Sequence, residues 1–251
     1  MRIDRVDLRN SALLLDVDGT ILDIAPTVHE VFVSESLRYT LGRLSDAANG
    51  ALALVSGRPL QDIDYLFAPL RLPAIGGHGA EIRVGVSNTI DGPRPISLDR
   101  ELKQRLREIA VKYPGVLIED KGYSLALHYR LAPEHELHVV SDVFRLRKYY
   151  DPEAFELLTG KAVIEVKKPG YNKGTAVREL MKYPPFYGRV PVFIGDDTTD
   201  EAAFAVMPEF DGTALSVGRR VLGIDGMFQT PKEVRRWLER ISTDIAVTGH
   251  G

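Results

Sequence analysis

A short apolar run that ends in two carboxylates is the feature that most limits how this chain can fold. Residues 12–15 read ALLL, and Asp16 and Asp18 follow within the segment DVDGT. A run of this length predicts a buried strand, and the glycine after Asp18 predicts a turn. In a doubly wound sheet, ligands bind beyond the carboxyl ends of the strands, so both carboxylates would lie at a site. An ordinary acidic turn after a strand explains the same residues equally well.

A second strand-and-turn segment offers groups that suit a phosphate. Residues 50–55 read GALALV, which predicts another buried strand, and Ser56, Gly57 and Arg58 follow it. A hydroxyl and a glycine amide at a strand end can hold a phosphate oxygen, and the helix expected to start near Pro59 has an anion-binding N-terminus. The alternative is a turn that only caps this helix, and the two roles are compatible.

Two later segments carry a lysine and a group of aspartates. Asn172 suits a helix N-cap, which would place Lys173 in the first turn, where a cation is unfavourable unless an anion lies nearby. Residues 190–194 predict another buried strand, and a group of three carboxylates follows it. These carboxylates are Asp196, Asp197 and Asp200. A solvated lysine and an acidic helix N-terminus are the alternative explanations.

The predicted gathering of carboxylates implies a cation. Asp16, Asp18 and the three later aspartates would repel one another at neutral pH unless a positive ion lies among them. The candidate ligands are all oxygens, and the chain has no cysteine and no clear histidine cluster, so magnesium fits better than zinc. The sequence therefore predicts Mg²⁺ as the cofactor.

Composition narrows the class of protein. With 251 residues, the chain is long enough for one α/β domain or for a core with a modest second domain, and 44% hydrophobic residues can fill its interior. A formal net charge of −3 gives no reason to expect nucleic acid or an anionic membrane as a partner. No apolar run has the length of a signal core or a membrane span, and the lack of cysteine is compatible with the cytosol. We expect a monomeric, cytoplasmic protein that acts on a small molecule.

The middle of the chain has a different pattern, in which a helix followed by two strands occurs twice. The predicted helices cover residues 98–111 and 133–148, and the strands lie near residues 116–119, 123–129, 155–158 and 162–166, with a hairpin turn at Thr159 and Gly160. Antiparallel hairpins between segments of a parallel sheet indicate a separate domain. We predict a core domain at residues 1–95 and 168–251, with an inserted, smaller α+β cap domain at residues 96–167.

Alternation in the middle region predicts strands with one apolar and one polar face. In residues 123–130, Leu125 and Leu127 point to one side while Ser124 and His128 point to the other. In residues 161–167, apolar and polar side chains alternate in the same way. The mixture of donors and acceptors suits a hydroxyl-rich ligand that bears a phosphate. A polar face exposed to water explains the pattern equally well.

Four segments, taken in this order, resemble those of the haloacid dehalogenase superfamily of aspartate-nucleophile phosphatases. They are DVDGT at 16–20, VSGR at 55–58, NKG at 172–174 and IGDDTTDE at 194–201. The resemblance implies an α/β fold whose core is a doubly wound, mostly parallel sheet. It also implies that Asp16 attacks phosphorus to form an aspartyl-phosphate, and that Asp18 protonates the leaving sugar oxygen and then activates water.

The same resemblance assigns the remaining roles. It implies that Mg²⁺ is held by the Asp16 carboxylate, the Asp18 backbone carbonyl and Asp196, so that two anions can meet. Ser56 and Lys173 would hold phosphate oxygens, and Gly57 and Arg58 would be further substrate contacts. Asp197 and Asp200 would order Lys173 and the water molecules around the metal from behind its ligands.

A narrower resemblance, to the trehalose-6-phosphate phosphatase family, comes mainly from the middle region. It is carried by Glu119-Asp-Lys121 with Ser124, by His128-Tyr-Arg130, by Lys161 with Glu165, by the segment GHGAE around His78, and by Asp197 where many capped relatives carry glycine. The implied sugar contacts are Glu119, Lys121, Ser124, His128, Arg130, Lys161 and Glu165, and His78 is a further substrate contact. The implied reaction is hydrolysis of trehalose 6-phosphate to trehalose and phosphate.

Two other functions fit the same core. One is another capped sugar phosphatase, or a phosphomutase that returns the phosphoryl group to a sugar. The other is a regulatory module without turnover, which the complete set of Asp16, Asp18, Lys173 and Asp196 disfavours.

Overall fold

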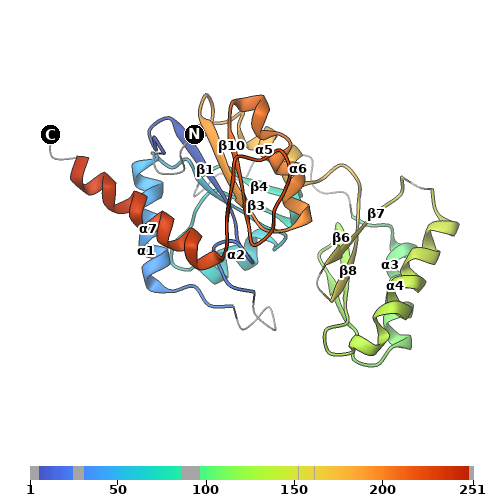
Figure 1. Ribbon diagram of the computed structural model, residues 1–251. Helices are drawn as coiled ribbons and strands as arrows, with labels where there is room; N and C mark the ends of the chain where they lie inside the picture. Colours follow the sequence, from blue (N-terminus) through green and yellow to red (C-terminus); the bar gives the residue numbers. More distant parts are fainter. Residues whose placement is uncertain (1–5, 25–30, 86–96, 152, 161, 249–251) are drawn as a thin grey trace. The chain divides into compact units, whose positions relative to one another are not determined.

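The computed structural model describes residues 6–24, 31–85, 97–151, 153–160 and 162–248, with side chains described up to residue 244. The chain divides into two compact units, Met1–Gly92 with Tyr171–Gly251, and Pro93–Gly170. They are named the core unit and the cap unit (Figure 1). The core unit holds a mostly parallel sheet and the cap unit an antiparallel one, so the predicted fold class is confirmed.

The core unit is built on a seven-stranded sheet in the order β11-β10-β9-β1-β2-β3-β4. Its strands are β1 (Ser11–Asp16), β2 (Leu52–Val55), β3 (Ala74–Gly76), β4 (Glu81–Arg83), β9 (Val190–Gly195), β10 (Thr213–Val217) and β11 (Gly226–Phe228). All neighbours pair in parallel except β3 and β4. Every residue of β1 is buried, as expected for a central parallel strand covered on both faces.

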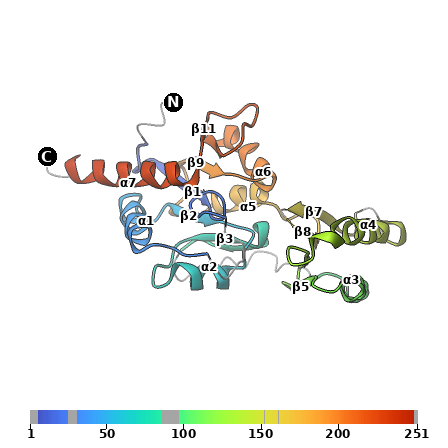
Figure 2. The ribbon, with the colours of Figure 1, turned by 60° about the horizontal axis from the view of Figure 1, so that its bottom comes forward.

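Helices cover this sheet on both sides. They are α1 (Glu35–Ala47), α2 (Leu60–Phe67), α5 (Lys173–Leu180), α6 (Glu201–Phe204) and α7 (Pro231–Thr248). In Figure 2 the strands lie between the pair α1 and α7 and the pair α5 and α6. Helix α1 shows how the sequence specifies this packing: Ser34 caps its first turn, and Leu37, Leu41 and Leu44 recur at helical spacing and are buried.

The cap unit is a four-stranded antiparallel sheet, in the order β5-β6-β8-β7, with two helices. Its elements are β5 (Leu117–Asp120), β6 (Ser124–His128), β7 (Glu156–Gly160), β8 (Val163–Lys167), α3 (Arg100–Lys112) and α4 (Glu136–Leu146). Leu125 and Leu127 of β6 and Ile164 and Val166 of β8 form a buried cluster with both helices. The predicted alternation is confirmed, because these apolar residues share one face of the sheet.

One local prediction in the cap unit is wrong. Thr159 and Gly160 do not form the hairpin turn, because both belong to β7. Gly160 pairs with Val163, the first residue of β8. Ala162, the residue before β8, has a left-handed backbone with φ of 63°. Strand pairing therefore extends through the Thr-Gly pair and overrides its local preference for a turn.

Within the described part of the chain, no helix is both long enough and apolar enough to cross a membrane.

Candidate active site

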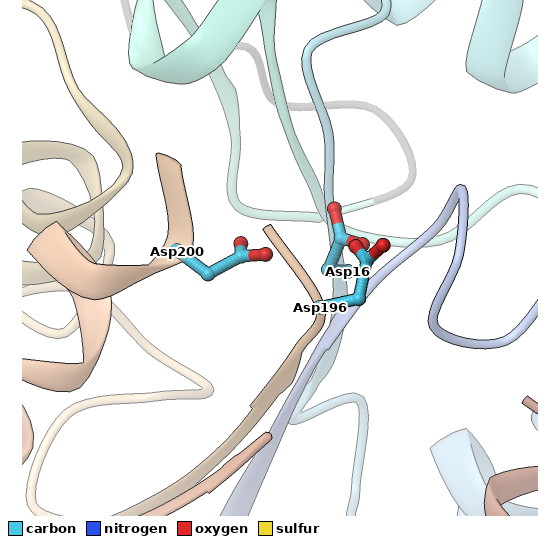
Figure 3. A group of neighbouring side chains, drawn as sticks. All are labelled: Asp16, Asp196 and Asp200. Atoms are coloured by element: carbon cyan, nitrogen blue, oxygen red, sulfur yellow. The ribbon is translucent and has the colours of Figure 1, made fainter. Parts of the chain in front are cut away.

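The carboxyl ends of two neighbouring strands bring the aspartates of the core unit together. Asp16 is the last residue of β1, Asp196 follows the last residue of β9, and the two strands pair in parallel with Leu15 opposite Ile194. One carboxylate oxygen from each of Asp16, Asp196 and Asp200 lies within 4.8 Å of the others (Figure 3). The structure therefore places at one edge of the sheet the acidic groups that the sequence separates by some 180 residues.

Lys173 joins two of these carboxylates. Its Nζ donates to Asp16 Oδ1 at 2.7 Å and to Asp200 Oδ1 at 2.6 Å, and all three side chains are buried. Lys173 is the first residue of α5, and Asn172 caps that helix by accepting from the amide of Thr175. The anion that a lysine in this first turn requires is therefore present as a pair of carboxylates.

The charges in this cluster shift the pKa values of its members. Burial raises the pKa of Asp16 well above its ordinary value of 3.8, and the Lys173 ammonium opposes that rise. Burial, together with the negative charges of Asp200 and Asp197, raises the pKa of Asp196 to about 6. Burial alone would lower the pKa of Lys173, but the charges of Asp16 and Asp200 outweigh it and raise that pKa. One lysine thus does not neutralise three carboxylates.

The donor set fits a divalent cation that prefers oxygen ligands. Asp16 Oδ2 is buried and makes no hydrogen bond within the described residues, while Oδ1 is held by Lys173. The excess negative charge and the purely carboxylate ligands match Mg²⁺ or a similar hard ion. Asp200 also belongs to this cluster, whereas Asp197 is exposed and its carboxylate accepts from the amide of Thr198 at 2.6 Å.

The close packing at this edge explains the glycine in DVDGT. A side chain at Gly19, whose φ is +84°, would collide with the carboxylate of Asp196. Thr20 Oγ1 donates to Asp196 Oδ1 over a long 3.5 Å. The sequence analysis did not predict Thr20 as a site residue. Its position in the DVDGT segment, next to Asp18 and Gly19, could have indicated it.

Asp18 is paired with Arg58, which comes from the turn after β2. Arg58 Nε lies 2.6 Å from Asp18 Oδ2, and Nη2 lies 2.7 Å from Oδ1, so that the ion pair is bidentate. The amide of Arg58 also donates to Ser56 Oγ at 3.1 Å, which is the predicted turn at this strand end. Ser56, Arg58 and Asp18 thus form one group beside the acidic cluster.

His78 packs against the same turn. Its amide donates to the carbonyl of Ser56 at 3.1 Å, and its imidazole lies so close to Gly57 that any side chain there would collide with it. His78 has a left-handed backbone with φ of 54°. The structure therefore brings His78 to the predicted phosphate-binding turn and explains why residue 57 is glycine.

Most of the predicted sugar contacts share the polar face of the cap sheet, opposite α3 and α4. His128 Nε2 lies 3.0 Å from Glu119 Oε2, and Lys121 Nζ lies 3.8 Å from Glu119 and 3.6 Å from Glu165. The hydrogen bond from His128 lowers the pKa of Glu119, and although burial opposes this effect, the Lys121 charge adds to it. Ser124 lies on the same face through its pairing opposite Lys167.

Two predicted contacts differ from this group. Arg130 follows the end of β6 and is exposed, and Lys161 lies outside the described residues. The same face carries an ion pair that was not foreseen, between Lys167 Nζ and Glu156 Oε2 at 2.8 Å. The alternation pattern placed Lys167 on this face, but the partner strand β7 was predicted one residue early.

Comparison with known proteins shows which family the chain belongs to. A family model described as trehalose-phosphatase matches residues 14–227, a range that includes all four motif segments and the whole cap unit. The chain belongs to the trehalose-phosphatase family. This membership confirms the resemblance found in the motifs and makes the chain a phosphatase.

Relatives support this assignment over most of the chain. The trehalose-6-phosphate phosphatase of Escherichia coli is 37% identical over 234 residues, which are 93% of this chain and 87% of that protein. A probable trehalose-phosphate phosphatase of Sinorhizobium fredii is 40% identical, over 90% of this chain and 84% of its own length.

Solved structures share the fold of this chain. A trehalose-6-phosphate phosphatase related protein superposes with a TM-score of 0.77 over 94% of this chain and 99% of its own, at 24% identity. The C-terminal domain of the Candida albicans trehalose-6-phosphate phosphatase gives a TM-score of 0.79 over 94% of this chain and 92% of its own, at 21% identity. At these identities the likeness concerns the fold.

Proposed function

We propose that the protein hydrolyses trehalose 6-phosphate to trehalose and phosphate in a Mg²⁺-dependent reaction. Its place in the trehalose-phosphatase family and its similarity to the trehalose-6-phosphate phosphatase of Escherichia coli support the substrate. The observation that carries the chemistry is the buried Asp16 carboxylate, held on one oxygen by Lys173 and adjoining Asp196 at the end of β1.

Asp16 is the nucleophile in this proposal. A carboxylate oxygen of Asp16 forms a bond to phosphorus while the bond from phosphorus to the sugar oxygen breaks, which leaves an aspartyl-phosphate. Water then attacks phosphorus, the bond to Asp16 breaks, and phosphate leaves. Lys173, 2.7 Å from Asp16 Oδ1, keeps the carboxylate oriented and offsets negative charge near the phosphoryl group.

Asp18 moves the protons. It donates a proton to the departing sugar oxygen in the first step and accepts one from water in the second. Ser56 and the amide of Gly57 lie at the neighbouring strand end and hold phosphate oxygens, with Arg58 and His78 beside them. Because phosphoryl transfer depends mainly on positioning and charge, this set of groups can carry it.

Asp16, Asp196 and the backbone carbonyl of Asp18 would hold Mg²⁺. Asp200 and Asp197 would not bind the ion directly but would order Lys173 and the water molecules around it. When bound, the ion supplies positive charge that lets an anionic nucleophile approach an anionic phosphate ester.

The cap unit supplies selectivity in this proposal. Carboxylates and ammonium groups alternate on its polar face, from Glu119 and Lys121 to Glu165, and can accept from and donate to sugar hydroxyls. Ser124, His128, Arg130 and Lys161 complete the proposed set of sugar contacts. A monomeric state and a cytoplasmic location stay predictions.

A substrate panel tests the proposal. Phosphate release is measured for trehalose 6-phosphate, glucose 6-phosphate and mannose 6-phosphate, each with Mg²⁺ and with a chelator. We expect the highest kcat/KM for trehalose 6-phosphate and no turnover with the chelator. Faster release from either monosaccharide phosphate would support another capped sugar phosphatase, and a lack of release from every compound would support a module without turnover.

A further inference from the structure

Arg219 reaches the acidic segment from a neighbouring loop. It follows β10, and its Nε donates to the backbone carbonyl of Asp196 at 2.8 Å while its Nη2 donates to the carbonyl of Asp197 at 2.9 Å. The same Nη2 lies 2.8 Å from Glu201 Oε1. The guanidinium thus spans two consecutive peptide groups next to the acidic cluster.

These carbonyls lie where the sheet no longer supports the backbone. Pairing between β9 and β10 ends with Gly195 opposite Ser216, so Asp196 and Asp197 have left the ladder. The Asp197 amide donates to Asp200 Oδ2 at 2.9 Å, which holds the segment from one side. Arg219 holds it from the other, and a planar fork with two bonds fixes peptide orientation better than a single donor does.

The backbone of Arg219 is itself anchored to the sheet. The buried Ser216 hydroxyl donates to the carbonyl of Arg219 at 2.7 Å. Next to it, the Gly218 amide donates to the carbonyl of Phe228 at 2.9 Å, which extends the pairing of β10 and β11. Arg219 therefore links the end of β10 to the segment that carries Asp196.

The Asp196 carboxylate depends on this support. The hydrogen bond from Thr20 to Asp196 Oδ1 is 3.5 Å long, which constrains the side chain weakly. The direction of the carboxylate therefore follows the orientation of its own peptide group, whose carbonyl Arg219 holds. We propose that Arg219 is a positioning residue that aims Asp196 at Asp16 and so sets the affinity of the site for its divalent cation, an inference that rests on the metal site of the proposed function.

Geometry and charge predict opposite effects when Arg219 is changed. Its positive charge near the aspartates opposes cation binding, so a role through charge alone means tighter binding after its removal. A positioning role means weaker binding. Arg219→Lys keeps the charge and loses the two-point fork, and it separates the two effects.

Calorimetric titration of the full chain with Mg²⁺, without substrate, tests the proposal. We expect Arg219→Lys and Arg219→Ala to raise the Kd by about 10- to 100-fold, the range for residues that orient metal ligands. Arg220→Ala is the matched control, because Arg220 is the exposed neighbour of Arg219, and its Kd should stay within about twofold of wild type. Glu201→Gln should also stay within about threefold, since both carbonyls keep their donors.

Several results would overturn the inference. They are an unchanged Mg²⁺ Kd in Arg219→Lys, tighter binding in Arg219→Ala, or a loss in Glu201→Gln as large as that in Arg219→Lys. Thermal unfolding in chelator shows whether each variant is folded. If Arg219→Ala is unfolded, the Mg²⁺ Kd of Arg219→Lys alone tests the proposal. At saturating Mg²⁺, the KM for trehalose 6-phosphate should match wild type, which a general structural defect would not allow. Wild-type protein that binds no Mg²⁺ would refute the metal site of the proposed function, whereas these variant results refute only the role of Arg219.

Discussion

Arg58 holds the carboxylate of Asp18 in a bidentate ion pair, with distances of 2.6 and 2.7 Å. The two residues are 40 positions apart and come from the ends of adjacent strands. Both oxygens of Asp18 accept from the guanidinium, so for its proposed role as proton donor one oxygen must be released to carry the proton while Arg58 orients the other. The orientation of Asp18 should affect the rate most for esters whose leaving oxygen needs a proton.

The first prediction concerns this pair. Arg58→Ala should lower kcat for trehalose 6-phosphate by about 10- to 100-fold, a part of the 10²- to 10⁴-fold that a positioned acid supplies. The loss should be smaller for p-nitrophenyl phosphate, whose leaving group departs without a proton. Steady-state kinetics on both esters measure the difference, with Arg71→Ala as the control because Arg71 is more exposed and pairs with Asp64 outside this group. Equal losses on the two esters would contradict a role in orienting Asp18.

Asp16→Asn should abolish turnover, with a loss on the order of 10⁴-fold or more, because an amide cannot replace the attacking carboxylate. Binding of trehalose 6-phosphate should stay measurable by calorimetry, since the other phosphate and sugar contacts are intact. Asp46→Asn is a suitable control, because that carboxylate is exposed in the last turn of α1 and has no part in the site. Turnover of Asp16→Asn near the wild-type level would exclude Asp16 as the nucleophile.

Lys173→Met should destabilise the protein as well as inactivate it. It leaves the buried carboxylates of Asp16 and Asp200 without their cation, and breaking a buried ion pair costs about 3–5 kcal/mol. Urea unfolding in chelator measures the change in the free energy of unfolding. Lys182→Met removes an exposed pair with Glu179 and should cost at most about 1 kcal/mol. Similar costs for the two variants would show that Lys173 is not a structural centre of the site.

Asp196 should make the stability of the metal-free protein depend on pH. Its pKa is about 6 in the folded state against 3.8 for the ordinary group, so the folded state binds this proton more tightly. The favourable contribution is full below pH 3.8 and is lost as the pH rises through 6. Asp196→Asn has no such proton to lose, so the variant should gain stability relative to wild type between pH 5 and pH 7.

The measurement is urea unfolding of both proteins in chelator at several pH values. A stability difference that stays constant across this range would contradict the shifted pKa. Addition of Mg²⁺ at pH 7 should stabilise wild type more than Asp196→Asn, because only wild type keeps the full set of ligands. Saturation at 100 times the Kd stabilises by about 2.7 kcal/mol.

The polar face of the cap sheet should govern selectivity and not chemistry. Glu119→Ala should lower kcat/KM for trehalose 6-phosphate by about 10- to 100-fold, as expected for one lost charged hydrogen bond, and should leave p-nitrophenyl phosphate hydrolysis nearly unchanged. Arg130→Ala should act in the same direction. Asp120→Ala is the matched control, because the Asp120 carboxylate pairs with Lys103 and Arg107 of α3 on the opposite face. Parallel losses on both esters in Glu119→Ala would mean that this face does not bind the sugar.

Much of the site could be predicted because strand ends are visible in the sequence. Asp16 and Asp196 each follow an apolar run, and parallel strands end at one edge, so their meeting needs only the order of the strands. The alternation of β6 and β8 likewise predicted a polar cap face with Ser124, His128 and Glu165 on it, because side chains on a strand repeat every second residue.

The contacts between loops could not be predicted in this way. Gly160 continues a strand where a Thr-Gly pair suggested a turn, because pairing with Val163 overrode the local preference. The ion pair of Arg58 with Asp18 and the bonds of Arg219 to the peptides of Asp196 and Asp197 join irregular segments. The residue pattern has no periodicity that predicts the path of such a segment beyond the end of its strand.

The sequence by itself determined which groups stand at the strand ends, and thereby the fold class, the family and the carboxylates available for chemistry. Only the tertiary structure decided which of those carboxylates is held by Lys173, which by Arg58, and which peptide groups Arg219 supports. The physical reason is that burial patterns are local and repetitive, whereas the direction of a charged side chain depends on partners that reach it from distant loops.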